Sequence, residues 1–195
     1  MSSSLDTRKS ATNPEIRLEL PKGGTLVLRP AKETDDSLLL QIYASTREDE
    51  LNQVPWDDGQ KEKFLRWQCD LQRNEYDSRY PDARYEIILV DDEPAGRMWI
   101  GEDDEQIRLM DIALFRQFQG RGVGTLLVKR LIEEARQAGK VLRHMVFILN
   151  NNAQQLYERL GFVVIEDLGA YKHMEWRKEA NADNVETSVA ADSKV

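Results

Sequence analysis

Residues 119–125 read QGRGVGT, three residues after the apolar run MDIALF (110–115) and directly before LLVKRLIEEARQAGK (126–140). Apolar residues recur at helical spacing after the loop and stop at Gly139, a residue type that commonly ends helices. The stretch therefore predicts a strand, a tight turn and an amphipathic helix. Unpaired backbone N–H groups at the start of a helix favour an anion such as a phosphate. Three glycines alternate in this turn: Gly120, Gly122 and Gly124.

The composition of the 195-residue chain is that of one acidic domain. Hydrophobic residues make up 41% of it, enough for one core of ordinary size. The net charge of -8 argues against a protein that follows a nucleic-acid backbone. The longest apolar run, MVFIL (145–149), is far shorter than the ~20 residues that span a bilayer, and the first residues lack the apolar stretch of a signal peptide. With one cysteine, Cys69, we expect a cytoplasmic protein without disulfides or membrane partners.

Hydrophobic periodicity and turn residues divide the chain into elements. The expected strands are 25–31, 85–90, 95–101, 107–115, 144–149, 162–167 and 170–176. The expected helices are 34–49, 60–76, 123–138 and 152–160. This order predicts an α/β (α+β) fold with a mixed, mostly antiparallel seven-stranded sheet, flanked by about four helices. We expect one domain at 15–178 between disordered tails at 1–14 and 179–195.

Two familiar nucleotide-binding loops do not fit the glycine stretch. A Walker-type loop needs a lysine before its Ser or Thr, and Gly124 precedes Thr125 here. The dinucleotide fingerprint needs a third glycine three residues after the second, where this chain has Thr125. Two interpretations remain for the loop alone. Either it binds an anion on its backbone with Arg121 beside it, or it is a tight turn with a solvated arginine.

Two sequence blocks taken together resemble a known family. QGRGVG (119–124) has the form Gln-x-x-Gly-x-Gly, and 26 residues after its last glycine NNNAQQLYERLGF (150–162) begins, with the form Asn-x-x-Ala-x-x-Leu-Tyr-Glu-x-x-Gly-Phe. In this order and spacing they resemble motifs A and B of the GNAT superfamily of acetyl-CoA-dependent N-acetyltransferases. The order of strands and helices is also similar to that fold. The resemblance covers about 25–177, with its specific part at 107–162.

The resemblance implies how acetyl-CoA, the co-substrate, would bind. In this family the fourth and fifth strands splay apart, and pantetheine lies between them on the main chain of the fourth strand. The pyrophosphate lies on the amides of the glycine loop, and no metal is involved. Carried onto this sequence, the implied cofactor-binding residues are Ile112, Ala113, Leu114, Gln119, Gly120, Arg121, Gly122, Val123, Gly124, Thr125, Asn150 and Tyr157.

The chemistry of acetyl transfer assigns roles to two of these residues. An amine attacks the thioester carbonyl, so an oxyanion develops and a thiolate leaves. The N–H of Leu114 is a candidate donor to the oxyanion. Tyr157 matches the family's tyrosine near the cofactor sulfur, and as a general acid it would protonate the thiolate. The alternative for Tyr157 is a packing role on its amphipathic helix.

The sequence leaves the general base open. Some family members place a Glu on the fourth strand, eleven residues before the first residue of motif A, and that register gives Arg108, which does not accept a proton at neutral pH. Asp111 is on the same strand, but alternation with Ile112 turns it to the other face unless a bulge intervenes. Glu86 and Glu102 are further candidates, and a water chain is an alternative to all three.

The sequence does not identify the molecule that accepts the acetyl group. Acids around Trp56, between the first two helices, would attract a cationic amine or form a solvated loop: Glu48, Asp49, Glu50, Asp57 and Asp58. His144 and His173 have no third partner that would support a metal site or a triad. We expect an N-acetyltransferase acting on a primary amine of a small molecule or protein, without a nucleic-acid partner. A homodimer is compatible with the resemblance. The alternatives are a non-catalytic CoA-binding module and an unrelated nucleotide-binding protein.

Overall fold

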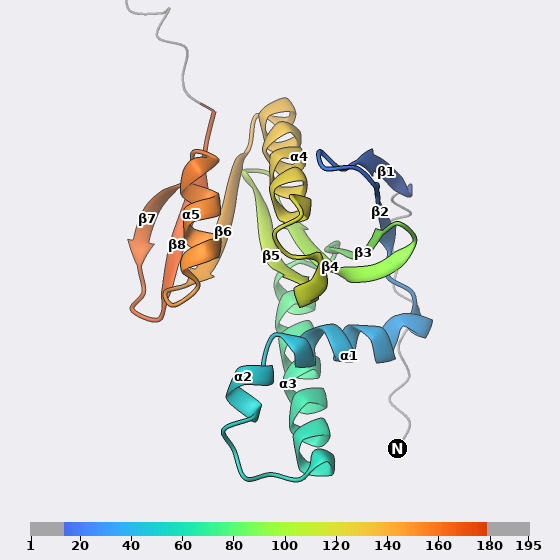
Figure 1. The fold of residues 1–195 in the computed structure, drawn as a ribbon. Helices are drawn as coiled ribbons and strands as arrows, with labels where there is room; N and C mark the ends of the chain where they lie inside the picture. The colour runs from blue at the N-terminus through green and yellow to red at the C-terminus, as the bar shows by residue number, and fades with distance from the viewer. Residues whose placement is uncertain (1–13, 179–195) are drawn as a thin grey trace, which may run out of the picture.

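The computed structural model describes residues 14–178, which form one open sheet with helices packed on both faces (Figure 1). The strands are β1 (Ile16–Glu19), β2 (Thr25–Pro30), β3 (Arg84–Val90), β4 (Glu93–Glu102), β5 (Gln106–Leu114), β6 (Val141–Phe147), β7 (Val163–Asp167) and β8 (Tyr171–Trp176). The helices are η1 (Glu33–Asp35), α1 (Asp36–Ser45), α2 (Glu48–Leu51), α3 (Asp58–Arg79), η2 (Arg116–Phe118), α4 (Val123–Ala138) and α5 (Asn151–Arg159). The expected α/β class is confirmed.

The sheet order is β1-β2-β3-β4-β5-β6-β8-β7, and every neighbouring pair is antiparallel except β5 and β6. The sheet has eight strands where seven were expected. The additional strand, β1, is an edge strand of four residues paired with β2. A run this short offers only two apolar residues in alternation, so it carries little signal before its partner is known.

The first predicted helix, 34–49, is divided into η1, α1 and α2. The end of α1 has a local cause. The hydroxyl of Ser45 donates to the carbonyl of Ile42 at 2.7 Å, and the hydroxyl of Thr46 donates to that of Tyr43 at 2.7 Å. Such side chains compete with the backbone for helical carbonyls, so the helix stops where they gather.

Helices α4 and α5 cover one face of the sheet, and α1 and α3 cover the other. The apolar stripe of α4 is fully buried in the main core: Val123, Leu127, Val128, Leu131 and Ala135. On the opposite face, Leu39 of α1 packs with Ile87 and Trp99 of the sheet. None of the helices within residues 14–178 is long and apolar enough to cross a membrane. The tails predicted at 1–14 and 179–195 lie outside the described residues, except for Pro14.

The expected splay lies between β5 and β6. Their parallel pairing begins at Gln106 and Val141 and ends at Leu109 and His144. Beyond that pair β5 stays with β4, and β6 stays with β8. A bulge at Met110 accompanies the split, because Trp99 pairs with Asp111 while the next residue of β4 pairs with Leu109. A bulge bends its strand and increases its twist, which moves the end of β5 away from β6.

Candidate active site

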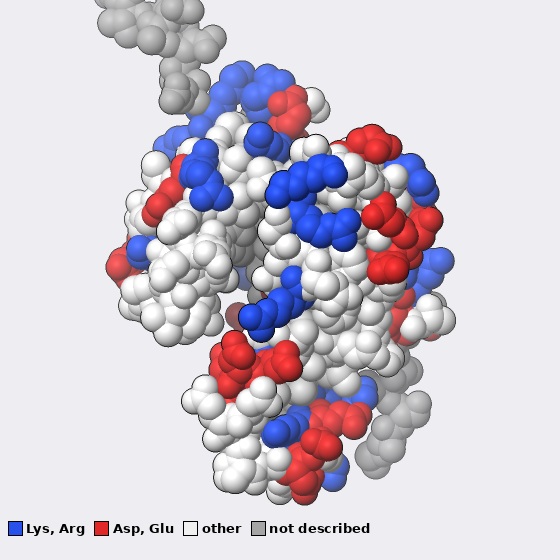
Figure 2. Space-filling view, viewed as in Figure 1, with Lys and Arg blue, Asp and Glu red and all other residues white. Residues whose placement is uncertain are grey.

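Where β5 and β6 separate, the edge of β5 faces a hollow (Figure 2). Helix α4 and β5 lie on one side of this hollow, and α5, β6 and β8 lie on the other. Phe115 donates its N–H to Ala95 at 2.9 Å, so the main-chain groups of Leu114, one residue earlier, point away from β4. By the same alternation Ile112 also directs its N–H and C=O towards the hollow. Apart from the Leu114 carbonyl, which Gln119 binds, the main chain at Ile112 and Leu114 therefore offers an unpaired strand edge, as pantetheine would require. The side chains of Ile112 and Leu114 pack against the main core, and Ala113 is buried.

Side chains bind three carbonyls along this edge. His144 Nδ1 lies 2.8 Å from the oxygen of Leu109, and the hydroxyl of Tyr76 donates to Met110 at 3.2 Å. Gln119 Nε2 donates to Leu114 at 2.9 Å. The last of these bonds ties the start of the glycine loop to the end of β5. Gln119 therefore joins the strand edge and the loop into one site.

The glycine loop presents a row of backbone donors. Gly120 has φ of 69° and Gly122 has φ of 90°, a left-handed conformation that other residues adopt only with strain. Within residues 14–178 none of the N–H groups of residues 120–125 donates a hydrogen bond, and the first bonded N–H of α4 is that of Leu126, to Gly122 at 3.0 Å. The helix dipole adds positive potential at the same place. These donors are suited to an anion.

Gly124 is not required by the fold itself. Its φ is not in the left-handed region, and a Cβ at this position would lie 3.7 Å from Leu156, an ordinary contact. The protein therefore has room for an alanine here. The glycine leaves space beside the backbone of α4 at this position.

Two cations lie at the loop. Arg121, predicted from the sequence, is partly exposed and stands 3.5 Å from the carboxylate of Asp91. Lys22 donates from Nζ to the carbonyl of Gly120 at 3.2 Å. Sequence reasoning did not identify Lys22, because it lies in the turn between β1 and β2 and no pattern links that turn to a loop 98 residues away.

Asn150 has a local structural role. It is the N-cap of α5, where its Oδ1 accepts the N–H of Ala153 at 3.1 Å. Next to it Gln154 Nε2 donates to Ile148 at 2.6 Å and fixes the corner between β6 and α5. The side-chain oxygen of Asn150 is therefore engaged in capping the helix.

Tyr157 and His144 meet where the strands divide. Tyr157 is 2% exposed, and its ring centroid lies 4.7 Å from that of His144 and 5.2 Å from that of Phe162. Burial, followed by the negative charge of Asp111, raises the pKa of Tyr157 well above 10. Burial lowers the pKa of His144 to about 4, so its ring is neutral at pH 7 and donates from Nδ1 to Leu109. Tyr157 therefore holds its proton, as a general acid must.

Asp111 lies on the side of the sheet that α1 and α3 cover. This is the face opposite Ile112 that alternation predicted, because the bulge at Met110 lies before Asp111 and leaves the alternation from Asp111 to Leu114 intact. Arg97 Nε donates to Asp111 Oδ2 at 2.7 Å. The Arg97 side chain is 1% exposed, stacks over Trp99 at 4.0 Å and donates from Nη2 to Gln72 at 3.2 Å. Asp111 itself is 21% exposed, so a rigid arginine orients a carboxylate that solvent still reaches.

The other two candidate bases lie away from the split. Glu86 is buried on β3, and its alternation with Ile88 places it on the face that α4 covers. Glu102 ends β4 and accepts from Lys140 Nζ at 2.8 Å, at the closed end of the β4–β5 hairpin. Of the three, the structure brings only Asp111 close enough for its charge to act on Tyr157 and His144.

Comparison with known proteins agrees with this architecture. Residues 39–162, more than half of the chain, match the model of the Acetyltransferase (GNAT) family. The chain belongs to this family. Two curated relatives are similar to parts of it: N-acetyltransferase MJ1207 of Methanocaldococcus jannaschii, 30% identical over 52% of this chain and 46% of its own length, and N-acetyltransferase CgeE of Bacillus subtilis, 28% identical over 40% of this chain and 30% of its own length. The chain thus spans less than half of the length of either relative.

A solved structure shares the fold. The PaiA N-acetyltransferase of Thermoplasma acidophilum, in complex with coenzyme A, matches with a TM-score of 0.61 over 78% of this chain and 99% of that one. At 16% identity this similarity shows that the two proteins share the fold, and no more than the fold.

Proposed function

We propose that this GNAT protein is an N-acetyltransferase that moves an acetyl group from acetyl-CoA to a primary amine of a small molecule or protein by direct attack. The observation that carries the proposal is the continuity of two backbone surfaces. The open edge of β5 ends at Leu114, and the Gln119 hydrogen bond joins it to the row of free N–H groups at the start of α4. An extended arm with a pyrophosphate at one end matches this pair of surfaces.

The cofactor would lie along both surfaces. The N–H groups of residues 120–125 would hold the pyrophosphate, and Arg121 and Lys22 would add positive charge beside it. The room at Gly124 lets a phosphate approach the backbone closely. Pantetheine would bond to the main chain of Ile112, beside the N–H of Leu114. The PaiA neighbour, whose structure contains coenzyme A, supports this placement by its shared fold.

The reaction needs a donor to the oxyanion and an acid for the thiolate. In the proposal the amine nitrogen bonds to the carbonyl carbon, the oxyanion accepts the N–H of Leu114, and the bond from carbon to sulfur then breaks. The thiolate takes the proton of Tyr157, which leaves free CoA and an amide. Tyr157 suits this step because its hydroxyl makes no hydrogen bond within residues 14–178 and keeps its proton at neutral pH.

The amine must lose a proton to become a nucleophile. We assign this proton to Asp111, directly or through a water molecule. Asp111 is the candidate base at the split, and Arg97 donates to its Oδ2, so Oδ1 is the oxygen that would take the proton. Acidic side chains gather over α2, on the same face of the molecule as the hollow, where they would attract an ammonium ion (Figure 2).

The alternative is a CoA-binding module of the same fold without catalysis. Arg108 occupies the strand position at which some family members carry a glutamate, and this observation favours the alternative. Thermal denaturation with acetyl-CoA, CoA and NAD, together with thiol release over a broad panel of amines, separates the two. Stabilisation by both CoA ligands with release by some amine is expected. Stabilisation without release from any amine would favour the module, and no stabilisation by either CoA ligand would exclude both.

A further inference from the structure

We propose that Arg108 forms an anion subsite for the acceptor, and that the acceptor is a primary amine which also carries a carboxylate. This inference rests on the proposed function and names the substrate class of the same site. Arg108 directly precedes Leu109, the last residue of β5 that pairs with β6. Because Leu109 is buried beneath α4, the alternation of the strand turns Arg108 to the opposite face, the side on which Asp111 lies.

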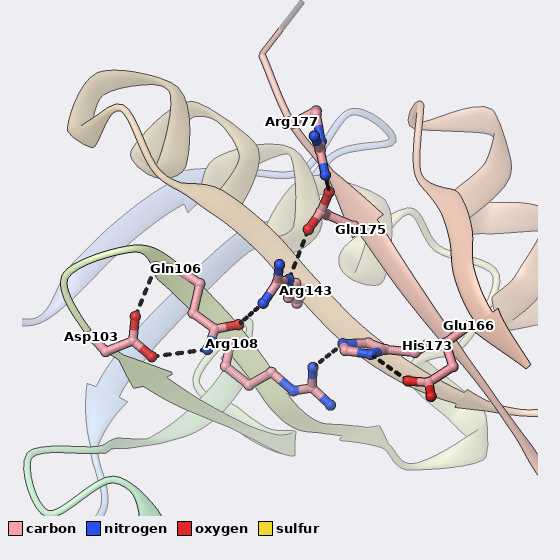
Figure 3. Close-up of polar contacts among 8 residues, drawn as sticks. All are labelled: Asp103, Gln106, Arg108, Arg143, Glu166, His173, Glu175 and Arg177. Atoms are coloured by element: carbon pink, nitrogen blue, oxygen red, sulfur yellow. Dashed lines mark hydrogen bonds and ion pairs between the residues drawn. The ribbon is translucent and has the colours of Figure 1, made fainter. Parts of the chain in front are cut away.

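Arg108 reaches across β6 rather than towards an acid. Its Nη1 lies 2.5 Å from Nε2 of His173 on β8 (Figure 3). The guanidinium donates, so Nε2 of His173 accepts and the ring proton is on Nδ1, which faces Glu166 at 3.7 Å. Burial lowers the pKa of His173, and the charges of Arg108 and Arg143 act in the same direction. The imidazole of His173 is therefore neutral: it accepts a hydrogen bond from Arg108 but does not balance the positive charge of the guanidinium.

The arginines of the sheet provide an internal comparison. Six arginines lie on the described strands, and five of them have a carboxylate within 4.0 Å. Arg108 is the exception among them. The five pairs are Arg17 with Glu15, Arg29 with Asp35, Arg84 with Glu134, Arg97 with Asp111, and Arg143 with Glu175.

The surroundings of Arg108 add positive charge. Burial lowers the pKa of Arg108, and the charges of Arg79 and Arg143 act in the same direction. The neighbouring acid, Glu175, is buried and already accepts from both Arg143 and Arg177 (Figure 3). The groups around the Arg108–His173 pair are Tyr76 and Arg79 of α3, Tyr80 directly after α3, Arg143 and His144 of β6, and Glu166 of β7. An excess cation in this half-buried place, within a chain of net charge -8, is suited to an anionic ligand.

A carboxylate is the anion that these groups fit. One excess positive charge is balanced by one negative charge, and a guanidinium with one N–H engaged keeps others for a carboxylate. Arg108 and Asp111 are three positions apart on β5, roughly 10 Å along the strand, and both face the same side of the sheet. A single small molecule can therefore place its amine near Asp111 and its carboxylate at Arg108. Amino acids have this pair of groups.

The histidines provide a direct test of binding. The chain contains two, His144 and His173, so the ring Cε1–H region of an NMR spectrum has two signals, assigned with His173→Gln. We expect glycine, 4-aminobutyrate or 6-aminohexanoate to shift the His173 signal and to raise its pKa, while the matching amides do not. Arg108→Gln should abolish this response. A His173 signal that ignores every carboxylate, or that responds equally in Arg108→Gln, would overturn the proposal.

Acceptor kinetics provide the second test. Each amino acid is compared with its amide in thiol release from acetyl-CoA. We expect kcat/KM to favour the carboxylate at least about tenfold, and Arg108→Gln to remove this preference by raising KM for the acid while KM for acetyl-CoA stays unchanged. Arg177→Gln is the matched control, because it removes a charge that Glu175 already neutralises. Equal rates for acids and amides, or the same loss in Arg177→Gln, would contradict the subsite.

Failure of the proposed function is distinguishable from failure of the subsite. If no amine releases thiol, the transferase activity fails, and the His173 titration alone decides whether carboxylates bind at Arg108. Thermal midpoints and stabilisation by acetyl-CoA establish that each variant is folded. Arg108→Lys keeps the charge but not the planar fork, so it should retain part of the preference for carboxylates.

Discussion

The two sides of the split sheet present different chemical groups: backbone groups on one side and side chains on the other. The side proposed for the cofactor is mostly backbone: the open edge of β5 and the N–H groups of residues 120–125. The side proposed for the acceptor is made of side chains that other side chains position, as Arg97 binds Asp111 and Arg108 contacts His173. A backbone site needs small residues at fixed spacing, so it leaves a pattern in the sequence. A side-chain site needs partners from distant elements, so it leaves none.

The largest expected effect is on the acceptor side. Asp111→Asn should lower kcat about a thousandfold, because an amide does not accept the proton of the amine. Binding of acetyl-CoA, measured by calorimetry, should change little. Asp104→Asn, an exposed acid in the β4–β5 turn, is the control. A kcat close to that of the wild type would exclude Asp111 as the base and leave a water chain.

Tyr157→Phe tests whether Tyr157, which lies between the two sides, is the general acid. Turnover should fall about a hundredfold with little change in the affinity for acetyl-CoA, since only the proton donor is lost. Tyr171→Phe is the matched control, because Tyr171 is exposed on β8 and packs on Phe147. An unchanged rate in Tyr157→Phe would reduce Tyr157 to a packing residue of the core.

His144 should make stability depend on pH. Its folded pKa of about 4 lies below its usual value of 6.5, so the unfolded state takes the proton first. The stability that neutral His144 contributes is complete above pH 6.5 and is lost as the pH falls towards 4. Between pH 6.5 and pH 5 the loss should be about 2 kcal/mol. Urea denaturation at both pH values should show a smaller difference in His144→Gln, and an identical difference would refute the assignment.

Two glycines of α4 should separate binding from folding. Gly124→Ala should weaken acetyl-CoA binding about tenfold with little change in thermal midpoint, since the fold has room for a Cβ. Gly139→Ala, at the other end of the same helix with φ of 68°, should cost about 1 kcal/mol of stability and leave binding intact. If Gly124→Ala destabilises the protein and leaves binding unchanged, the glycine serves the fold and not the cofactor.

The elements that the sequence predicted best are those with long periodicity. The stripe of α4 from Val123 to Ala135 extends over most of a helix and matched the structure closely. The short strand β1 and the division between α1 and α2 did not appear in the pattern. Both depend on local hydrogen bonds: β1 needs β2 beside it, and α1 ends at the hydroxyls of Ser45 and Thr46.

The candidate site divides in the same way. The sequence indicated the glycine loop, the strand edge and Tyr157, because motif spacing carries that information. It left Asp111 open as the base, since counting from Leu109 and counting from Ile112 place Asp111 on opposite faces, and the bulge at Met110 makes the count from Ile112 the right one. Lys22 and the contact between Arg108 and His173 had no signal, because their partners lie 98 and 65 residues away.

By itself the sequence determined the fold class, the family and the glycine loop before α4, because hydrophobic period and glycine spacing are local properties of the chain. The tertiary structure decided which carboxylate lies at the split and which arginine lacks an acid. A bulge of one residue turns Asp111 to the side of Arg97, and the packing of β8 against β6 brings His173 to Arg108. Charge balance depends on distances in space, and no spacing along the chain encodes those distances.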